Sequence, residues 1–324
     1  MKKRSKAILQ NLAVSLFATI LAISIGETGT RLYAFGGDAF NYEKVNSFDN
    51  AFQSGIAQTS DIKGLEYELV PSLDIWYKLT PFRTNKFGLR DDACTKYRKY
   101  GVRRIAIIGD SFTMGTGVAQ NQLYHTIVEN KLNAGNDTIG YELLNFGVSG
   151  YNLNKYEIQL KETVIDFKPD EVVIGFCAYN DHYLPDKSPK IDSIPAGTTA
   201  KGFWEFYFKR LIKLRFFMQH DVQKLKYEKE HLQYIEERFN GIRQFCEEKK
   251  IRVSVIYLSN LYKPKEASQI ELISKNMGFK FVDTSCYFKK KDIAHYSVNV
   301  FDTHPNDKAN KIFGAALFNL LKND

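Results

Sequence analysis

The chain has 324 residues, of which 44% are hydrophobic and 25% charged, and this balance excludes an intrinsically disordered protein. Its length suits one large domain with appended segments. The formal net charge is +8, and the basic residues are spread along the chain. A modest excess of this kind does not favour a nucleic-acid-binding protein, so we expect no nucleic-acid partner.

The four cysteines do not form a metal-binding pattern. They stand far apart, none belongs to a CxxC pair, and no cluster of histidines accompanies Cys94, Cys177, Cys246 and Cys286. A zinc site is therefore not predicted. We expect separate, mostly buried thiols. One disulfide remains an alternative for an exported protein, and the sequence does not select the pair.

The chain begins with a basic segment followed by an apolar one. Lys2, Lys3, Arg4 and Lys6 precede residues 8–25, ILQNLAVSLFATILAISI, which is close to the length of about 20 residues that a membrane span needs. No small-x-small cleavage site follows. We therefore predict an uncleaved anchor within residues 1–30, with a cleaved signal peptide as the alternative. The basic flank places the N-terminus in the cytoplasm and the remainder outside.

Residues 31–100 form a second region. The sequence predicts a stalk with some helix, then a small β unit over residues 64–90 whose short extended runs are broken by Pro71 and Pro81. Asn85 and Gly88 near its end indicate a turn. Whether this unit binds substrate or only packs against the main domain is left open by the sequence.

Residues 101–324 alternate between strand-like and helix-like segments. The predicted strands are 105–108, 141–145, 171–176, 252–258 and 280–283, and the predicted helices are 123–132, 155–166, 227–250 and 306–321. Such alternation predicts an α/β fold: a three-layer α/β/α sandwich around a doubly wound, flavodoxin-like parallel sheet.

One insertion, at about residues 184–226, does not follow this alternation. Three prolines mark its first part as a loop, and a basic amphipathic helix follows. We expect that helix to pack on its own domain, and binding to a membrane surface is the alternative.

Polar residues and glycines follow several of the predicted strands. Gly109, Asp110 and Ser111 come directly after the run 105–108, Gly150 follows the second strand, and Asn180 follows the third. Asp302 and His304 precede the last helix. Because the carboxyl ends of parallel strands share one sheet edge, we expect these groups to converge there. Together they supply a nucleophile, a base, an acid and oxyanion donors for acyl transfer.

These segments resemble the four sequence blocks of the SGNH, or GDSL-like, hydrolase superfamily. The blocks are GDSF at 109–112, NFGVSGYN at 145–152, AYND at 178–181 and DTHPN at 302–306. Phe112 stands in place of the commoner leucine, Ala178 in place of a glycine, and only Thr303 separates Asp302 from His304. The resemblance covers residues 103–324 apart from the insertion.

The resemblance implies a role for each residue that matches a block. Ser111 is the implied nucleophile, His304 the general base and acid, and Asp302 the group that orients His304. The implied oxyanion hole consists of the Ser111 and Gly150 backbone N–H groups and the Asn180 side chain. No metal or organic cofactor is implied. We expect Asp110 and Asp181, which flank these residues, to brace the backbone.

The implied function is that of an extracytoplasmic serine esterase that acts on O-acyl esters, with an O-acetylated glycan as the expected substrate. The expected partners are therefore an acylated glycan or lipid ester and, through the N-terminal helix, the membrane. Two alternatives use the same residues: an O-acyltransferase for an exported polysaccharide, and a lipase or lysophospholipase. A non-catalytic binding protein is disfavoured by the complete set of Ser, Gly, Asn and His.

Overall fold

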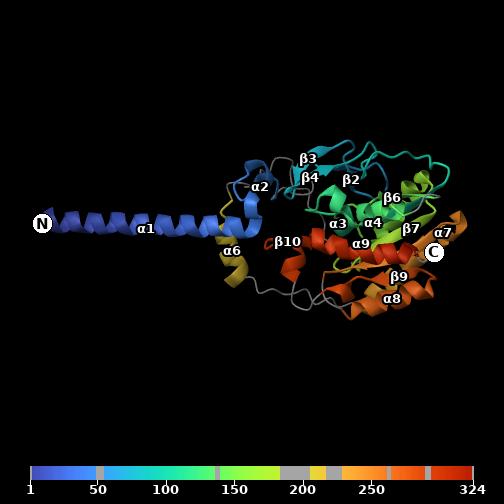
Figure 1. Ribbon diagram of the computed structural model, residues 1–324. Coiled ribbons are helices and arrows are strands. Elements are labelled where there is room, and N and C mark those ends of the chain that lie inside the picture. Colours follow the sequence, from blue (N-terminus) through green and yellow to red (C-terminus); the bar gives the residue numbers. More distant parts are fainter. Residues whose placement is uncertain are drawn as a thin grey trace.

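The computed structural model describes residues 2–48, 55–135, 139–182, 205–216, 228–260, 264–288 and 293–322. Its centre is a five-stranded parallel sheet, shown in Figure 1. The strand order is β6-β5-β7-β8-β9, with β5 (Val102–Gly109), β6 (Gly140–Asn145), β7 (Glu171–Cys177), β8 (Arg252–Leu258) and β9 (Lys280–Asp283). This is the flavodoxin-like order, and it confirms the predicted doubly wound sheet.

The central strands form where the sequence has short β-branched runs. All seven residues of β7, EVVIGFC, are buried, as are the last six of β5. A strand covered by helices on both faces has no polar face, which explains why its sequence is continuously apolar rather than alternating.

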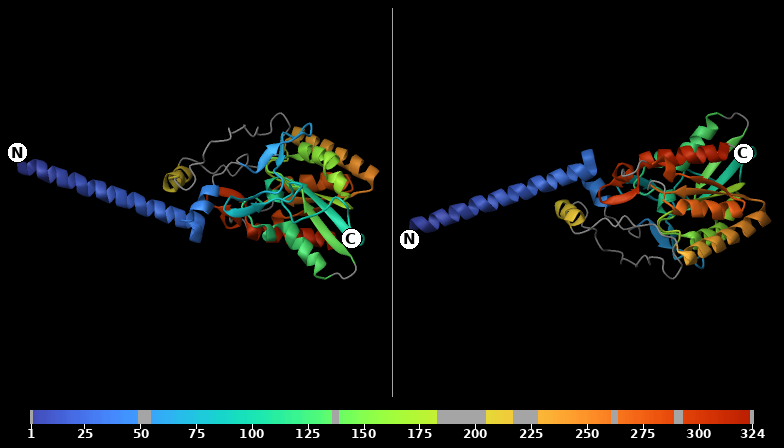
Figure 2. Two further views of the ribbon diagram at one scale, coloured as in Figure 1. Left: turned by 90° about the horizontal axis from the view of Figure 1, so that it is seen from above. Right: turned by 90° about the horizontal axis from the view of Figure 1, so that it is seen from below.

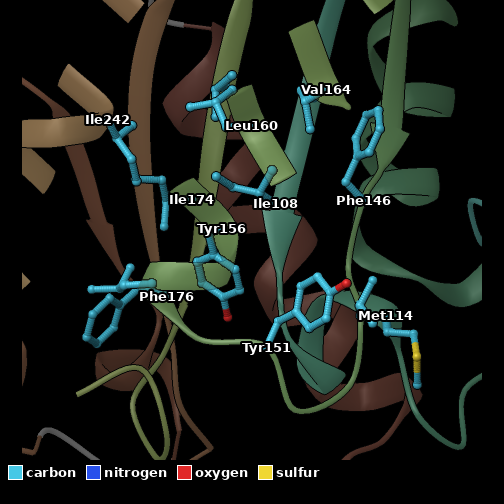
Figure 3. Close-up of a cluster of buried hydrophobic side chains, with 14 of the residues drawn as sticks. Ile108, Met114, Phe146, Tyr151, Tyr156, Leu160, Val164, Ile174, Phe176 and Ile242 are labelled. Carbon is cyan, nitrogen blue, oxygen red and sulfur yellow. The ribbon is translucent and has the colours of Figure 1, made fainter. Parts of the chain in front are cut away.

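Helices cover both faces of the sheet and make the predicted three layers. One face carries α5 (Leu153–Glu162), α7 (Lys229–Lys249) and α8 (Glu266–Asn276), and the other carries α4 (Tyr124–Asn133) and α9 (Asp307–Lys322). Figure 3 shows the first core, where Ile108 and Ile174 of the sheet lie beside Leu160 of α5 and Ile242 of α7. Helix α8 was not predicted, although Ala267 and Ile270 mark its buried side.

The helix predicted over residues 155–166 is shorter than expected. α5 ends at Glu162, and a 3₁₀ turn, η3 (Val164–Phe167), follows it. Thr163, Val164 and Ile165 are three β-branched residues in succession. Such residues lose side-chain freedom in a helix, so an α-helix ends readily at this run.

The N-terminal apolar segment lies within one long helix, α1 (Lys2–Phe35), which projects away from the body in Figures 1 and 2. Its best 18-residue window has a mean hydropathy of 2.0 and is 0% buried. By length and composition this helix meets the requirements of a membrane span, and a signal sequence meets them as well.

The next elements form a cap of short helices and hairpins. A 3₁₀ turn, η1 (Gly36–Asp38), leads into α2 (Tyr42–Phe48). Two antiparallel ladders follow: β1 (Ala57–Thr59) with β2 (Tyr67–Leu69), and β3 (Asp74–Tyr77) with β4 (Thr80–Arg83). Asn85 makes the predicted turn, since its Oδ1 accepts hydrogen bonds from the backbone N–H groups of Phe87 and Leu89 at 2.9 and 3.2 Å.

Part of the insertion is described as helix α6 (Tyr207–Phe216). Residues 184–204 and 217–226 lie outside the described residues. Tyr207 is buried and contacts Phe35 of α1 and Phe301, with ring centroids 4.8 and 5.7 Å apart. The helix therefore packs on its own chain: it contacts Phe301 of the predicted domain and also α1, which lies outside that domain.

The cysteines are four separate thiols, as predicted, and no disulfide joins them. Cys94, Cys177 and Cys246 are buried, and Cys286 is exposed.

Candidate active site

Ser111 lies where β5 turns into a short helix, α3 (Ser111–Met114). Asp110 is the N-cap of that helix: its Oδ1 accepts a hydrogen bond from the backbone N–H of Phe112 at 2.9 Å. This capping bond satisfies one of the free N–H groups at the helix start. Asp110 therefore braces the backbone, as expected, by capping α3. Ser111 occupies the first turn of that helix.

Glycines at the strand ends provide the space that α3 needs. A Cβ atom at Gly109 or Gly175 would lie 2.1 or 2.3 Å from the hydroxyl oxygen of Thr113. A Cβ atom at Gly147 would lie 2.3 Å from the backbone nitrogen of Met114. These distances are far below van der Waals contact, so the helix that carries Ser111 fits only against a backbone without side chains.

His304 and Asp302 come from a hairpin that the sequence analysis did not predict. β11 (Asp302–Pro305) pairs with β10 (Ser297–Asn299), directly before the last helix. Successive side chains of a strand point to opposite faces, so residues two apart point the same way. The extended backbone therefore explains why a single intervening residue suffices between Asp302 and His304.

The hairpin brings His304 between Ser111 and Asp302. His304 Nε2 lies 3.0 Å from Ser111 Oγ, and His304 Nδ1 lies 2.6 Å from Asp302 Oδ1. The backbone N–H of His304 also donates to Asp302 Oδ1, at 3.0 Å. All three side chains predicted to form a catalytic triad are thus in one hydrogen-bonded line, across a separation of 193 residues between Ser111 and His304.

A lysine from the N-terminal cap adds a positive charge to this line. Lys78 Nζ lies 3.8 Å from Asp302 Oδ2. Burial alone raises the pKa of Asp302. The hydrogen bond and charge of His304, the charge of Lys78 and the backbone N–H of His304 outweigh burial, and they hold the pKa of this carboxyl well below its usual range. Asp302 therefore stays ionised.

Lys78 is held by the turn between β3 and β4. Lys78 and Leu79 have φ angles of +50° and +71°, in the left-handed region. Their backbone N–H groups donate to the carbonyl and hydroxyl oxygens of Ser47, at 3.1 and 3.2 Å. Neither residue is the glycine or asparagine that usually signals such a turn, so sequence reasoning missed this contact.

The predicted oxyanion donors lie on two neighbouring loops. The loop after β6 is joined to the end of β5 by a hydrogen bond from the Val148 N–H to the Gly109 carbonyl at 3.0 Å, and Gly150 within it has a φ angle of +78°. Within the described ranges, no acceptor takes the backbone N–H of Ser111 or Gly150. Both N–H groups are therefore available to a ligand.

Asn180 joins the second loop to the first. Its Nδ2 donates to the carbonyl oxygen of Tyr151 at 3.3 Å. The phenol of Tyr67 donates to the carbonyl oxygen of Ser149 at 2.8 Å. The small β unit therefore supports the loop that carries Gly150.

A layer of buried polar groups lies next to Asp110. Asp181 accepts hydrogen bonds from the Cys177 backbone N–H at 2.7 Å and from the Tyr156 hydroxyl at 2.8 Å. Burial, followed by the charge of Asp110, raises the pKa of Asp181 well above its usual range. The expected bracing role of Asp181 is thus visible in its bond to the backbone at the end of β7.

Two further groups that support the site were not predicted from the sequence. Arg90 is fully buried and donates to the carbonyl oxygens of Met114, Gly115 and Val118, at the end of α3. Asn260 accepts from the Tyr179 hydroxyl at 2.6 Å and donates to the Thr303 carbonyl at 3.0 Å, so it links the Asn180 loop to the His304 strand. Neither position belongs to a recognisable motif.

Comparison with known proteins finds similarity only at the level of solved structures. No family model matches the chain, and no curated protein matches it significantly. A two-domain esterase, CEX, active on acetylated mannans is 12% identical with a TM-score of 0.44, and the match covers 68% of this chain but only 49% of that protein. The chain thus spans about half the length of that esterase.

Two other structures match over most of their length. The acetylxylan esterase Axe2 from Geobacillus stearothermophilus is 20% identical with a TM-score of 0.42, covering 70% of this chain and 96% of that one. A G-D-S-L family protein from Desulfitobacterium hafniense DCB-2 is 13% identical with a TM-score of 0.41, covering 67% and 98%.

Proposed function

We propose that this protein is a serine esterase of the SGNH type that cleaves O-acyl esters through Ser111, His304 and Asp302. The observation that carries the proposal is the continuous hydrogen-bonded line from Ser111 Oγ to His304 Nε2 at 3.0 Å and from His304 Nδ1 to Asp302 Oδ1 at 2.6 Å. A serine hydroxyl is a weak nucleophile unless a base accepts its proton, and this geometry supplies that base.

In the first half of the reaction, Ser111 Oγ attacks the acyl carbon of the ester while its proton passes to His304 Nε2. The ionised Asp302 accepts a hydrogen bond from His304 Nδ1, which leaves Nε2 unprotonated and free to act as the base. The tetrahedral intermediate then collapses: the bond between the acyl carbon and the alcohol oxygen breaks, and His304 returns the proton to the leaving alcohol.

The negative oxygen of the tetrahedral intermediate needs hydrogen-bond donors. We assign these to the backbone N–H groups of Ser111 and Gly150 and to Asn180 Nδ2. The bond from Asn180 to the Tyr151 carbonyl, at 3.3 Å, is longer than the usual range, so a charged oxygen competes well for this donor.

In the second half, a water molecule attacks the acyl-serine. His304 takes a proton from that water and gives it to Ser111 Oγ as the acyl group leaves as a carboxylic acid. Every proton in the cycle moves through His304, so the proposed hydrolysis needs no group beyond the described side chains and water.

The proposal extends to location and substrate. α1 has the length and composition of a span, and Lys2, Lys3, Arg4 and Lys6 precede its apolar part, which supports an anchor within residues 1–30 with the remaining chain outside the cytoplasm. We propose residues 31–100 as a cap and 101–324 as the hydrolase domain. Short acyl esters of a glycan, O-acetyl esters above all, are the proposed substrate, because an anchored enzyme outside the cytoplasm would face the glycans of the cell envelope.

The first test is p-nitrophenyl acetate turnover by the full-length protein in detergent, beside the variant Ser111→Ala. We expect the substitution to lower kcat by about 10⁴- to 10⁶-fold, because it removes the nucleophile. A fluorophosphonate should label the wild type at Ser111 and leave Ser111→Ala unlabelled. Ser149→Ala, on the neighbouring loop, is the matched control and should keep both properties.

Two results would contradict the proposal. Equal turnover by wild type and Ser111→Ala would exclude Ser111 as the nucleophile, and a folded wild type with neither turnover nor labelling would exclude the esterase. Labelling without turnover, followed by acetyl transfer to a glycan acceptor, would identify the same site as an acyltransferase. A series of longer acyl esters separates the acetyl esterase from a lipase.

A further inference from the structure

Helix α6 lies against α1 just beyond the apolar segment 8–25. The ring of Phe208 is so close to Gly26 that a Cβ atom there would lie 2.8 Å from it, and the Phe208 backbone N–H donates to Glu27 at 2.8 Å. Arg31 of α1 donates to the Glu205 carbonyl at 3.1 Å. At a rise of about 1.5 Å per residue, these contacts fall within about 9 Å of the end of the apolar segment, the depth of a lipid headgroup layer.

The direction of α6 suits a position in the plane of a membrane. Figure 1 shows α6 running across the end of α1 rather than along it, and both views of Figure 2 look nearly down its axis. A helix that lies across a transmembrane helix at the end of its apolar part is parallel to the membrane surface.

The two sides of α6 differ in their surroundings. One side faces the body, because Tyr207 contacts Phe35 and Phe301, and Arg210 stacks over Phe48 and Phe301 with centroid distances of 5.7 and 4.9 Å. We call the opposite side the outer face, which consists of the exposed residues Phe206, Lys209, Ile212, Lys213 and Arg215.

The outer face combines apolar and basic side chains. Phe206 and Ile212 are 39% and 38% exposed although they are large and apolar. None of the three cations, Lys209, Lys213 and Arg215, has an acidic partner among the described side chains. Apolar residues between long basic ones are typical of helices at a membrane interface, where the aliphatic stems lie along the acyl boundary and the charges reach the headgroups.

We infer that the outer face of α6 binds the surface of the membrane that α1 enters, with its cations on anionic phospholipid headgroups. This inference rests on the membrane anchor of the proposed function, but not on the esterase chemistry. Phe301, which α6 contacts, directly precedes Asp302 of the proposed triad. Membrane contact through α6 therefore holds the Asp302 hairpin close to the lipid surface, where an ester carried by a membrane-bound molecule would be presented.

Lipid photocrosslinking of the full-length chain tests the inference. The protein is reconstituted in nanodiscs of phosphatidylcholine and phosphatidylglycerol, with p-benzoylphenylalanine replacing Ile212 of the outer face, Phe17 of the apolar segment or Leu272 of α8. Leu272 is the matched control, since it is a large apolar residue that is 61% exposed on the far part of the body. Adducts are identified by mass spectrometry.

We expect lipid adducts at positions 17 and 212 and none at 272, with phosphatidylglycerol several-fold enriched at 212 over its share of the lipid. The variant K209Q/K213Q/R215Q should lose that enrichment, whereas K249Q/K275Q/K311Q, on other surfaces, should keep it. Adducts at 17 but not at 212, or at 212 without enrichment, would overturn the inference. No adducts at 17 would instead refute the anchor itself, and turnover of p-nitrophenyl acetate would report separately on the esterase.

Discussion

At the scale of single residues, the charge state of Asp302 depends on two neighbours from two regions of the chain. His304 supplies hydrogen bonds and a charge, and Lys78 supplies a charge at 3.8 Å. Burial and the Asp302 charge raise the pKa of Tyr77, so its phenol stays neutral. A carboxyl whose pKa is lowered in the folded state contributes stability above its unfolded pKa, which is lost as the pH falls through the folded value. This contribution of Asp302 is therefore complete at neutral pH.

Removing the Lys78 charge should change the pH dependence of catalysis. In Lys78→Met, the cation of Lys78 no longer offsets the negative charge of Asp302. That negative charge then stabilises the protonated imidazole of His304 more strongly. Because attack by Ser111 needs the neutral imidazole, the acid limb of kcat/KM should move to higher pH by about 0.5 unit, the effect of one partly screened charge. Lys78→Arg should retain the wild-type profile, and Lys44→Met, which removes a cation of α2, is the control. A Lys78→Met profile that superimposes on the wild type would rule out this role.

Asn180→Ala should remove one oxyanion donor without removing the nucleophile. Loss of such a donor typically costs about 2.7–4 kcal/mol, so we expect kcat to fall about 10²- to 10³-fold. KM should change little, because the donor acts on charge that develops only in the transition state. Fluorophosphonate labelling of Ser111 should persist, at a reduced rate. An unchanged kcat would exclude Asn180 from the oxyanion hole.

At the scale of elements, α3 is held by two supports. Its last residue packs on Gly147, where a Cβ would come within 2.3 Å of the Met114 nitrogen, and Arg90 binds the carbonyl groups of Met114, Gly115 and Val118 at and beyond that end. Burial lowers the pKa of Arg90 to about 9, so the side chain is charged at neutral pH. A helix of four residues has too few internal hydrogen bonds to hold its own position, and these supports set the position of Ser111.

Arg90→Met should destabilise the protein strongly. The substitution leaves the carbonyl groups at the end of α3 buried without a donor, and we expect a loss of at least about 3 kcal/mol in the free energy of unfolding. Urea denaturation measures this loss. Arg98→Met is the control, since Arg98 pairs with Asp170 at a partly exposed site and such pairs contribute about 1 kcal/mol or less. Equal midpoints for the two variants would refute the proposed support.

At the scale of the whole molecule, the cap and the α/β domain together make the site. Tyr67 holds the loop of Gly150, Lys78 contacts Asp302, and Arg90 holds α3. The unit of residues 64–90 thus packs on three segments of the site. Tyr67, Phe82 and Leu89 also belong to buried parts of the molecule.

Truncation should therefore separate the anchor from the cap. A chain that begins at Gly26 keeps every support of the site and should keep wild-type turnover of p-nitrophenyl acetate in solution. A chain that begins at Gly101 lacks Tyr67, Lys78 and Arg90, and should lose both turnover and fluorophosphonate labelling. Circular dichroism shows whether each chain is folded. A folded chain from Gly101 with wild-type activity would show that the cap is dispensable.

Local pattern was enough to predict most of the α/β domain. β8 and β9 have the predicted bounds, and the last five residues of β8 are buried, as expected of a strand that helices cover on both faces. The segments that carry Ser111 and Asn180 were located because each follows a predicted strand. The segment that carries His304 was located because it precedes the last predicted helix. The β10–β11 hairpin was missed, since its strands are short and its two connecting residues are Val300 and Phe301; the turn signal is Asn299, whose Oδ1 accepts from the Phe301 N–H at 2.8 Å.

What the sequence alone determined is therefore the doubly wound sheet and the long N-terminal apolar helix, and it also supplied the proposed reactive groups, because each is encoded by neighbouring residues. Tertiary structure alone decided that Lys78, Tyr67 and Arg90 reach the site and that α6 lies across the end of α1. These contacts join residues far apart in the chain through single hydrogen bonds or ion pairs. A single contact of this kind leaves no periodicity in the sequence, so only the folded chain reveals it.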